Sequence, residues 1–113
     1  MSQITTHVLD VSLGRPAAKV AVILEAQSPR GAWKEAGRGS TDGDGRCGDL
    51  AAAKTLEAGV YRLTFDTRTY FSSRNLGALY PQVIIVFEVK DAREHYHIPL
   101  LLSPFGYSTY RGS

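Results

Sequence analysis

The stretch Val60-Tyr-Arg-Leu-Thr-Phe-Asp66 indicates most clearly which class of fold this chain adopts. Its apolar residues Tyr61, Leu63 and Phe65 are separated by single polar residues. A period of two places the apolar side chains on one face of an extended strand and the polar ones on the other. The segment therefore predicts a β-strand with one face in the core and one face in solvent.

Short segments of similar character lie on both sides of it, separated by turns rich in Gly, Pro, Asp and Ser. They are Ile4–Val11, Val20–Ala26, Ala32–Ala36, Arg46–Leu50, Gln82–Val89, His95–Ser103 and Gly106–Arg111. Only Thr67–Leu76 indicates a helix, with Tyr70 and Phe71 as its apolar face and Gly77 as its end. Roughly seven to eight strands with one short helix predict an all-β sandwich.

Length and composition exclude several classes of protein. A chain of 113 residues predicts a single domain spanning 1–113. One cysteine, Cys47, excludes an internal disulfide framework and a cysteine-based zinc site. Thirteen Lys and Arg residues are interspersed with eleven Asp and Glu residues, so no basic block indicates a nucleic-acid partner.

No segment indicates a membrane protein. The longest purely apolar runs, Val20–Leu24 and Val83–Phe87, are far shorter than the roughly 20 residues that a membrane-spanning helix needs. The N-terminal residues lack the basic and apolar regions of a secretory signal. We therefore expect a cytoplasmic protein.

Three histidines are candidates for chemistry. His95 and His97 flank Tyr96, so both imidazoles share one face if the strand is regular. Imidazoles at this spacing can share a metal ion, but no cysteine cluster or carboxylate is expected on that face. We therefore expect no metal site. A single histidine such as His7 more commonly lies at the surface or is hydrogen-bonded in the core.

The stretch Asp42-Gly-Asp-Gly-Arg-Cys47 resembles a calcium-binding loop only superficially. Arg46 stands where such a loop needs an oxygen ligand, and Cys47 stands where it needs glycine. The pattern therefore predicts a turn that ends at Arg46. Cys47 has no neighbouring base and no Gly-x-Ser-x-Gly motif is present, so nothing indicates a covalent nucleophile.

Two further stretches carry a specific resemblance. The last nineteen residues are His95-Tyr-His-Ile-Pro-Leu-Leu-Leu-Ser-Pro-Phe-Gly-Tyr-Ser-Thr-Tyr-Arg-Gly-Ser113, and the start holds Ile4-Thr-Thr-His-Val-Leu-Asp10 followed by Gly14-Arg-Pro-Ala17. Together they resemble the 5-hydroxyisourate hydrolase family, whose members are related to transthyretin. The resemblance runs over the whole chain, and the terminal Tyr110-Arg-Gly-Ser113 resembles the mark of the hydrolases.

This resemblance implies a transthyretin-like (prealbumin-like) sandwich and a homotetramer, a dimer of dimers, with active sites in a channel between dimers. The implied reaction is hydrolysis of 5-hydroxyisourate to 2-oxo-4-hydroxy-4-carboxy-5-ureidoimidazoline in urate degradation, without a cofactor. The family's catalytic residues match His7, Arg46 and His97. Hormone-carrying transthyretins have lysine, glutamate and threonine at these positions and lack the terminal tetrapeptide.

Each matched residue has an expected role. One imidazole acts as the general base, while the other orients water or protonates the leaving nitrogen. Arg46 binds carbonyl oxygens of the substrate and neutralises developing charge. The residues expected to bind substrate are His7, Arg46, Ser108, Tyr110, Arg111 and Ser113. Ser108 shares a strand face with Tyr110, and His95 is expected to be peripheral. The alternative is a transthyretin-like carrier of a small ligand without catalysis.

Overall fold

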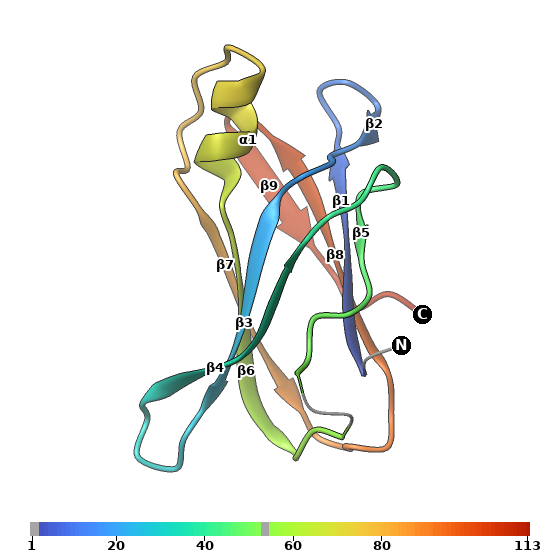
Figure 1. The fold of residues 1–113 in the computed structure, drawn as a ribbon, viewed down its shortest axis with the longest axis vertical. Coiled ribbons are helices and arrows are strands. Elements are labelled where there is room, and N and C mark those ends of the chain that lie inside the picture. Colours follow the sequence, from blue (N-terminus) through green and yellow to red (C-terminus); the bar gives the residue numbers. More distant parts are fainter. Residues whose placement is uncertain (1–2, 53–54) are drawn as a thin grey trace.

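The computed structural model describes residues 3–52 and 55–113, which form two β-sheets packed face to face and one short helix (Figure 1). The strands are β1 (Ile4–Asp10), β2 (Arg15–Pro16), β3 (Ala21–Gln27), β4 (Trp33–Ser40), β5 (Arg46–Cys47), β6 (Gly59–Phe65), β7 (Val83–Val89), β8 (Tyr96–Ser103) and β9 (Gly106–Thr109). The helix α1 spans Thr67–Ser73. The prediction of an all-β sandwich with one short helix is confirmed.

The order of the strands explains which parts of the chain meet. One sheet has the order β2-β1-β8-β9, with β5 also pairing with β1, and the other has the order β4-β3-β6-β7. Within the described ranges, β1 and β8 form the one parallel pair among antiparallel neighbours. The first strand of the chain therefore lies beside a strand near its end.

The core lies between the two sheets. In β6 the alternation predicted from the sequence is confirmed, since Tyr61, Leu63 and Phe65 are all buried. In β8 the same alternation buries Ile98 and Leu100, while the odd-numbered His97 and Leu101 are only half buried. The outer face of the β2-β1-β8-β9 sheet thus carries the side chains that are available for chemistry.

Most strand boundaries differ from the prediction by one residue, and three segments differ more. β4 continues to Ser40, which pairs with Ala21 of β3. Gly37 lies within it, and a Cβ atom on Gly37 would lie 1.6 Å from the Leu50 carbonyl oxygen. The expected strand Arg46–Leu50 keeps only two residues in the ladder. Arg15–Pro16, predicted as a turn, forms a short edge strand instead, an edge being where proline is tolerated.

The helix and the last strand are both shorter than predicted. Helix α1 ends at Ser73, before the predicted end at Gly77, because Asn75, with φ of 57°, takes the left-handed conformation. The N–H of Leu76 then donates to the carbonyl oxygen of Phe71 at 2.9 Å, which closes the helix end. The last strand ends at Thr109, and the residues after it leave the regular ladder.

A buried carboxylate ties the helix to the first strand. The hydroxyl of Tyr70 donates to Asp10 Oδ2 at 2.6 Å, and Arg74 forms an ion pair with the same carboxylate. Burial alone raises the pKa of Asp10, but hydrogen bonds from Ser12, Tyr70 and the Leu13 N–H, together with the charge of Arg74, outweigh it. The pKa of Asp10 therefore lies below its ordinary value, and the carboxylate stays ionised at neutral pH.

Among the described residues, no helix is long and apolar enough to cross a membrane.

Candidate active site

Three neighbouring strands bring the predicted catalytic residues together. In the ladder, His7 of β1 pairs with Arg46 of β5 on one side and with Pro99 of β8 on the other. Thr5, two residues earlier on the same face of β1, pairs with His97. The rings of His7 and His97 consequently lie 6.5 Å apart, measured between centroids. The two imidazoles and Arg46 share the outer face of the sheet.

The turn before β5 positions Arg46. The Asp42 carboxylate accepts hydrogen bonds from the N–H groups of Asp44 and Arg46 at 2.9 and 3.0 Å, as the predicted turn requires. Gly45 adopts a φ of 76°, and a Cβ atom there would lie 2.4 Å from the Val8 carbonyl oxygen. Glycine is therefore needed at this position for the turn to approach β1 closely.

A cavity of about 230 Å³ opens beside these residues. Its lining comprises Thr5, Thr6, Arg46, Cys47, Gly48, His95, His97 and Ser113. Arg46, His97 and Ser113, which were predicted as site residues, thus share one cavity, and His7 lies next to it.

Hydrogen bonds fix one nitrogen of each central imidazole. His7 Nε2 lies 2.8 Å from the carbonyl oxygen of Asp44, which only accepts, so Nε2 carries a proton and donates it. His97 Nδ1 lies 2.8 Å from Oγ1 of Thr5. The nitrogens left for water or substrate are therefore Nδ1 of His7 and Nε2 of His97.

The environment of His97 favours its neutral form. Partial burial of the imidazole, followed by the positive charge of Arg46 and the neighbouring His7 and His95, lowers the pKa of His97. An imidazole whose pKa lies below the ordinary histidine value is neutral at physiological pH. It can therefore accept a proton.

His95 is not peripheral, and that expectation is wrong. Its ring stacks against that of His97 with 6.4 Å between centroids, and its Nε2 lies 3.1 Å from Thr5 Oγ1. The spacing of the two histidines did predict a common face. No local pattern indicated that the Thr5 hydroxyl would lie between the two histidines, because Thr5 is 90 positions away from His95.

The C-terminal tail, residues 110–113, reaches the cavity through its last residue. The N–H of Gly112 donates to the carbonyl oxygen of His97 at 2.7 Å, which holds the tail against β8. Ser113 lines the cavity, whereas Ser108 and Tyr110 are exposed and do not line it. Of the C-terminal residues expected to contact substrate in this region, the described structure therefore places Ser113 at the cavity wall but not Ser108 or Tyr110.

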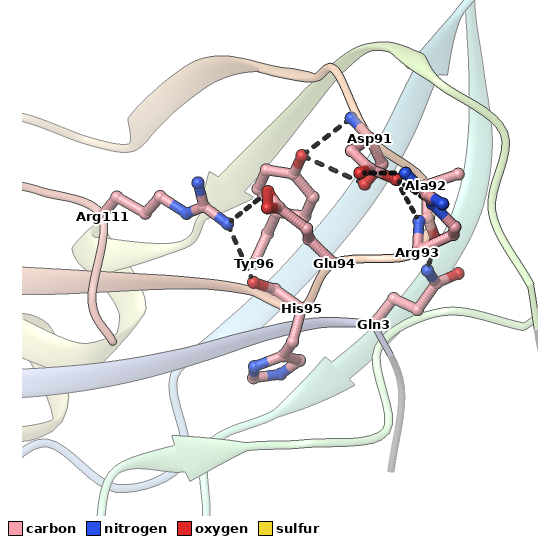
Figure 2. Close-up of polar contacts among 8 residues, drawn as sticks. All are labelled: Gln3, Asp91, Ala92, Arg93, Glu94, His95, Tyr96 and Arg111. Atoms are coloured by element: carbon pink, nitrogen blue, oxygen red, sulfur yellow. Dashed lines mark hydrogen bonds and ion pairs between the residues drawn. The ribbon is translucent and has the colours of Figure 1, made fainter.

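Arg111 points away from the cavity. Its guanidinium donates to Glu94 Oε1 and to the carbonyl oxygen of His95, both at 3.2 Å, and lies over the ring of Tyr96. Figure 2 shows the imidazole of His95 on the opposite side of its backbone from this guanidinium. Arg111 does not line the cavity of this chain, because it holds the tail to the turn before β8. Its expected contact with substrate stays a prediction.

Cys47 and the histidines raise two other chemistries at this cavity, covalent catalysis and metal binding. Burial raises the pKa of the Cys47 thiol, so the group is protonated at neutral pH and a poor nucleophile. Across residues 3–52 and 55–113, no group of three or more His, Cys, Asp or Glu side chains is arranged to hold a metal ion.

Sequence comparison connects this geometry with known proteins. The profile of the HIUase/Transthyretin family matches residues 4–112. The chain belongs to the HIUase/transthyretin family. A 5-hydroxyisourate hydrolase of Salmonella dublin is 44% identical to this family member over 97% of the chain and 80% of the relative. A 5-hydroxyisourate hydrolase of Mus musculus is 41% identical over 99% of the chain and 96% of the relative.

Solved structures of the HIUase/transthyretin family confirm the predicted fold. The 5-hydroxyisourate hydrolase of Klebsiella pneumoniae is 34% identical, with a TM-score of 0.85 and coverage of 97% of this chain and 98% of that one. Sea bream transthyretin in complex with thyroxine is 32% identical, with a TM-score of 0.91 and coverage of 97% and 94%. Because both superpose well, the backbone does not separate an enzyme from a carrier, and the distinction rests on the site residues.

Proposed function

We propose that this chain hydrolyses 5-hydroxyisourate to 2-oxo-4-hydroxy-4-carboxy-5-ureidoimidazoline, a step of urate degradation. The observation that carries the proposal is the arrangement of His7, His97 and Arg46 on adjacent strands around one cavity. Relatives that are 41–44% identical over nearly the whole chain are 5-hydroxyisourate hydrolases, which supports it.

His97 is the general base of the proposed reaction. Opening a cyclic amide requires that water lose a proton, that the developing oxyanion be stabilised, and that the leaving nitrogen be protonated. The lowered pKa of His97 keeps its imidazole neutral, and the contact of Nδ1 with Thr5 leaves Nε2 to accept the proton of water. His7, whose Nε2 donates to Asp44, holds the attacking water at Nδ1.

Arg46 supplies the positive charge. Its guanidinium lines the cavity beside His97 and presents several N–H donors in one plane. A planar guanidinium matches the carbonyl oxygens of a flat heterocycle and stabilises the oxyanion that forms during attack. Ser113 adds a hydroxyl and the terminal carboxylate to the same cavity.

The proposed active form is a homotetramer, a dimer of dimers, in which a second subunit closes the cavity. The large apolar side chains Val11, Leu13, Phe105, Tyr107 and Tyr110 are exposed on or beside the strands of the β2-β1-β8-β9 sheet. A cluster of this kind is typical of an interface. In the assembly, Ser108, Tyr110 and the end of the tail wall the channel from both sides. Light scattering should give a mass of about four times 12.3 kDa.

A carrier of a small aromatic ligand is the second candidate, because the backbone superposes on thyroxine-bound transthyretin. The chemistry of the cavity argues against it. An apolar ligand gains nothing from two imidazoles and a guanidinium, whose desolvation costs free energy unless each is hydrogen-bonded.

One assay separates the two candidates. Urate and urate oxidase generate 5-hydroxyisourate, whose ultraviolet absorbance decays slowly in buffer. Addition of the protein should accelerate this decay in proportion to its concentration, and a chelator should leave the rate unchanged. A decay rate that does not respond to the protein would overturn the proposed function.

A further inference from the structure

The Thr5 hydroxyl lies between two imidazole nitrogens. Its Oγ1 is 2.8 Å from Nδ1 of His97 and 3.1 Å from Nε2 of His95. Only 7% of Thr5 is exposed, whereas His95 is exposed and His97 is half buried. The three groups therefore form a continuous hydrogen-bonded chain along the wall of the cavity, which all three line.

One hydroxyl proton couples the states of the two rings. When both imidazoles are neutral, the hydroxyl donates to one of the facing nitrogens and accepts from the other. In one state Nδ1 of His97 is protonated and Nε2 of His95 is not. In the other state Nε2 of His95 is protonated and Nδ1 of His97 is not. Since a general base at Nε2 of His97 requires the proton on Nδ1, the basic form of His97 requires a bare Nε2 on His95.

The surroundings disfavour positive charge on His97. Arg46 and His7 face His97, and burial adds to their effect by disfavouring its imidazolium. At His95, Arg111 donates to the carbonyl oxygen rather than to the ring, and Glu94 pairs with that arginine, as Figure 2 shows. The His95 ring lies on the other side of the backbone, where water can accept a proton from it.

We propose that Thr5 and His95 form a proton relay that serves His97 in the hydrolysis proposed above. The lone pair of His97 Nε2 takes a proton from the attacking water. His97 Nδ1 passes its proton to Thr5 Oγ1, the hydroxyl passes its own to His95 Nε2, and His95 releases its Nδ1 proton to water in the cavity.

The relay also resets itself. After the base step, His97 carries its proton on Nε2, which is the form that donates to the leaving nitrogen. Donation runs the chain in reverse: His97 Nδ1 regains a proton from Thr5, Thr5 from His95, and His95 from water in the cavity. The starting tautomers are then restored. The second proton of the attacking water ends on the product carboxyl group, which ionises at neutral pH.

Thr5 and His95 act through His97, so they are positioning residues, and their variants should change kcat far more than KM. His95→Gln keeps an amide that can hydrogen-bond to Thr5 but cannot shuttle a proton. It should lower kcat by about tenfold in dilute buffer, well short of the ~100- to 10,000-fold loss for a missing general base. Added imidazole should restore kcat by exchanging protons with Thr5 in place of the missing ring.

The matched pair at Thr5 is Thr5→Val, which removes the hydroxyl, and Thr5→Ser, which keeps it. Thr5→Val should show the same loss of kcat, and Thr5→Ser should restore it; circular dichroism and a thermal melt establish that each variant is folded. Because His95 is exposed, His95→Gln keeps the test valid if Thr5→Val does not fold. An unchanged kcat of His95→Gln in dilute buffer, or a loss that imidazole does not rescue, would overturn the relay.

A second readout does not depend on turnover. Long-range nitrogen–proton NMR of isotope-labelled histidine reports which ring nitrogens are protonated. Wild type and Thr5→Ser should show opposite protonation at His97 Nδ1 and His95 Nε2, and Thr5→Val should lose this correlation. If the wild type proves inactive on 5-hydroxyisourate, the proposed function fails while this measurement still decides whether the hydrogen-bonded chain exists. Identical tautomers in all three proteins would contradict it.

Discussion

The backbone of Gly112 lies against the imidazole of His97. The Gly112 N–H donates to the His97 carbonyl oxygen at 2.7 Å, and a Cβ atom on Gly112 would lie 2.6 Å from Cδ2 of His97. Any side chain at this position would displace either the ring or the tail. The glycine of the terminal tetrapeptide therefore sets how closely the tail approaches the proposed base.

Gly112→Ala should lower kcat by about a hundredfold, because a shift of about 1 Å in a reacting group has an effect of this size. The matched control is Gly77→Ala, where an added Cβ atom meets nothing within 4 Å. Steady-state kinetics on 5-hydroxyisourate checks both variants. Equal kcat values for Gly112→Ala and wild type would show that the ring tolerates the contact.

Arg46 should control the pH dependence of the reaction. Because the pKa of His97 is lowered, the base stays neutral and kcat/KM holds up at pH values below about 6.5, the ordinary pKa of histidine. Arg46→Gln removes a positive charge, so the pKa of His97 should rise and the acid limb of kcat/KM should move to higher pH. Arg46→Lys keeps the charge and should leave the limb in place, while KM rises because the planar donors are lost. If the acid limb of kcat/KM lies at the same pH in Arg46→Gln as in wild type, Arg46 does not have this electrostatic role.

Tyr70→Phe should reduce the free energy of unfolding by about 2 kcal/mol, the usual contribution of a hydrogen bond to a charged group. The hydroxyl of Tyr70 donates to the buried Asp10 carboxylate at 2.6 Å. Urea unfolding of the variant and of Tyr80→Phe provides the comparison, since the Tyr80 hydroxyl has no hydrogen-bond partner among the described residues.

The stabilisation that Asp10 provides should depend on pH with a defined sign. The folded pKa of Asp10 is lowered, so its contribution is complete above the unfolded value of about 3.9 and disappears as the pH falls through the folded value. The stability difference between wild type and Tyr70→Phe should shrink over that acid range. A difference that stays constant there would mean that the hydroxyl acts independently of the ionised carboxylate.

Removing Ser113 should raise KM by about tenfold, which corresponds to the loss of one hydrogen bond to substrate. Ser113 is the residue of the tail that lines the cavity. Arg111→Ala should also raise KM, although indirectly, because Arg111 fastens the tail to Glu94 and to the backbone of His95. Arg93→Ala removes an arginine of the same turn that pairs with Asp91, and its KM should match wild type. If removal of Ser113 and Arg111→Ala both leave KM at the wild-type value, as Arg93→Ala should, the tail does not hold substrate.

The sequence predicted the local structure because strand periodicity is local. The alternation around Leu63 and the turn that ends at Arg46 each involve a few consecutive residues, and both are found in the structure. Boundaries were less predictable. β4 extends to Ser40 by pairing with β3, in which Ala21 lies opposite Ser40, and no local pattern encodes such a pairing.

The candidate site was predictable only in part. The resemblance to the family identified His7, Arg46 and His97, and the structure brings these three together. It did not indicate the position of His95 in the cavity or the outward direction of Arg111, since each depends on a partner elsewhere in the chain.

The sequence by itself determined which residues form strands and which face of each strand is apolar, because both follow from the spacing of neighbouring residues. Only the tertiary structure decided that β1 runs parallel to β8, which sets Thr5 opposite His97 across 92 positions of sequence. Pairing between distant strands depends on how the two sheets bury their apolar faces together, and a shift of one residue would turn His97 into the core. The chemistry of this site is therefore a consequence of that register.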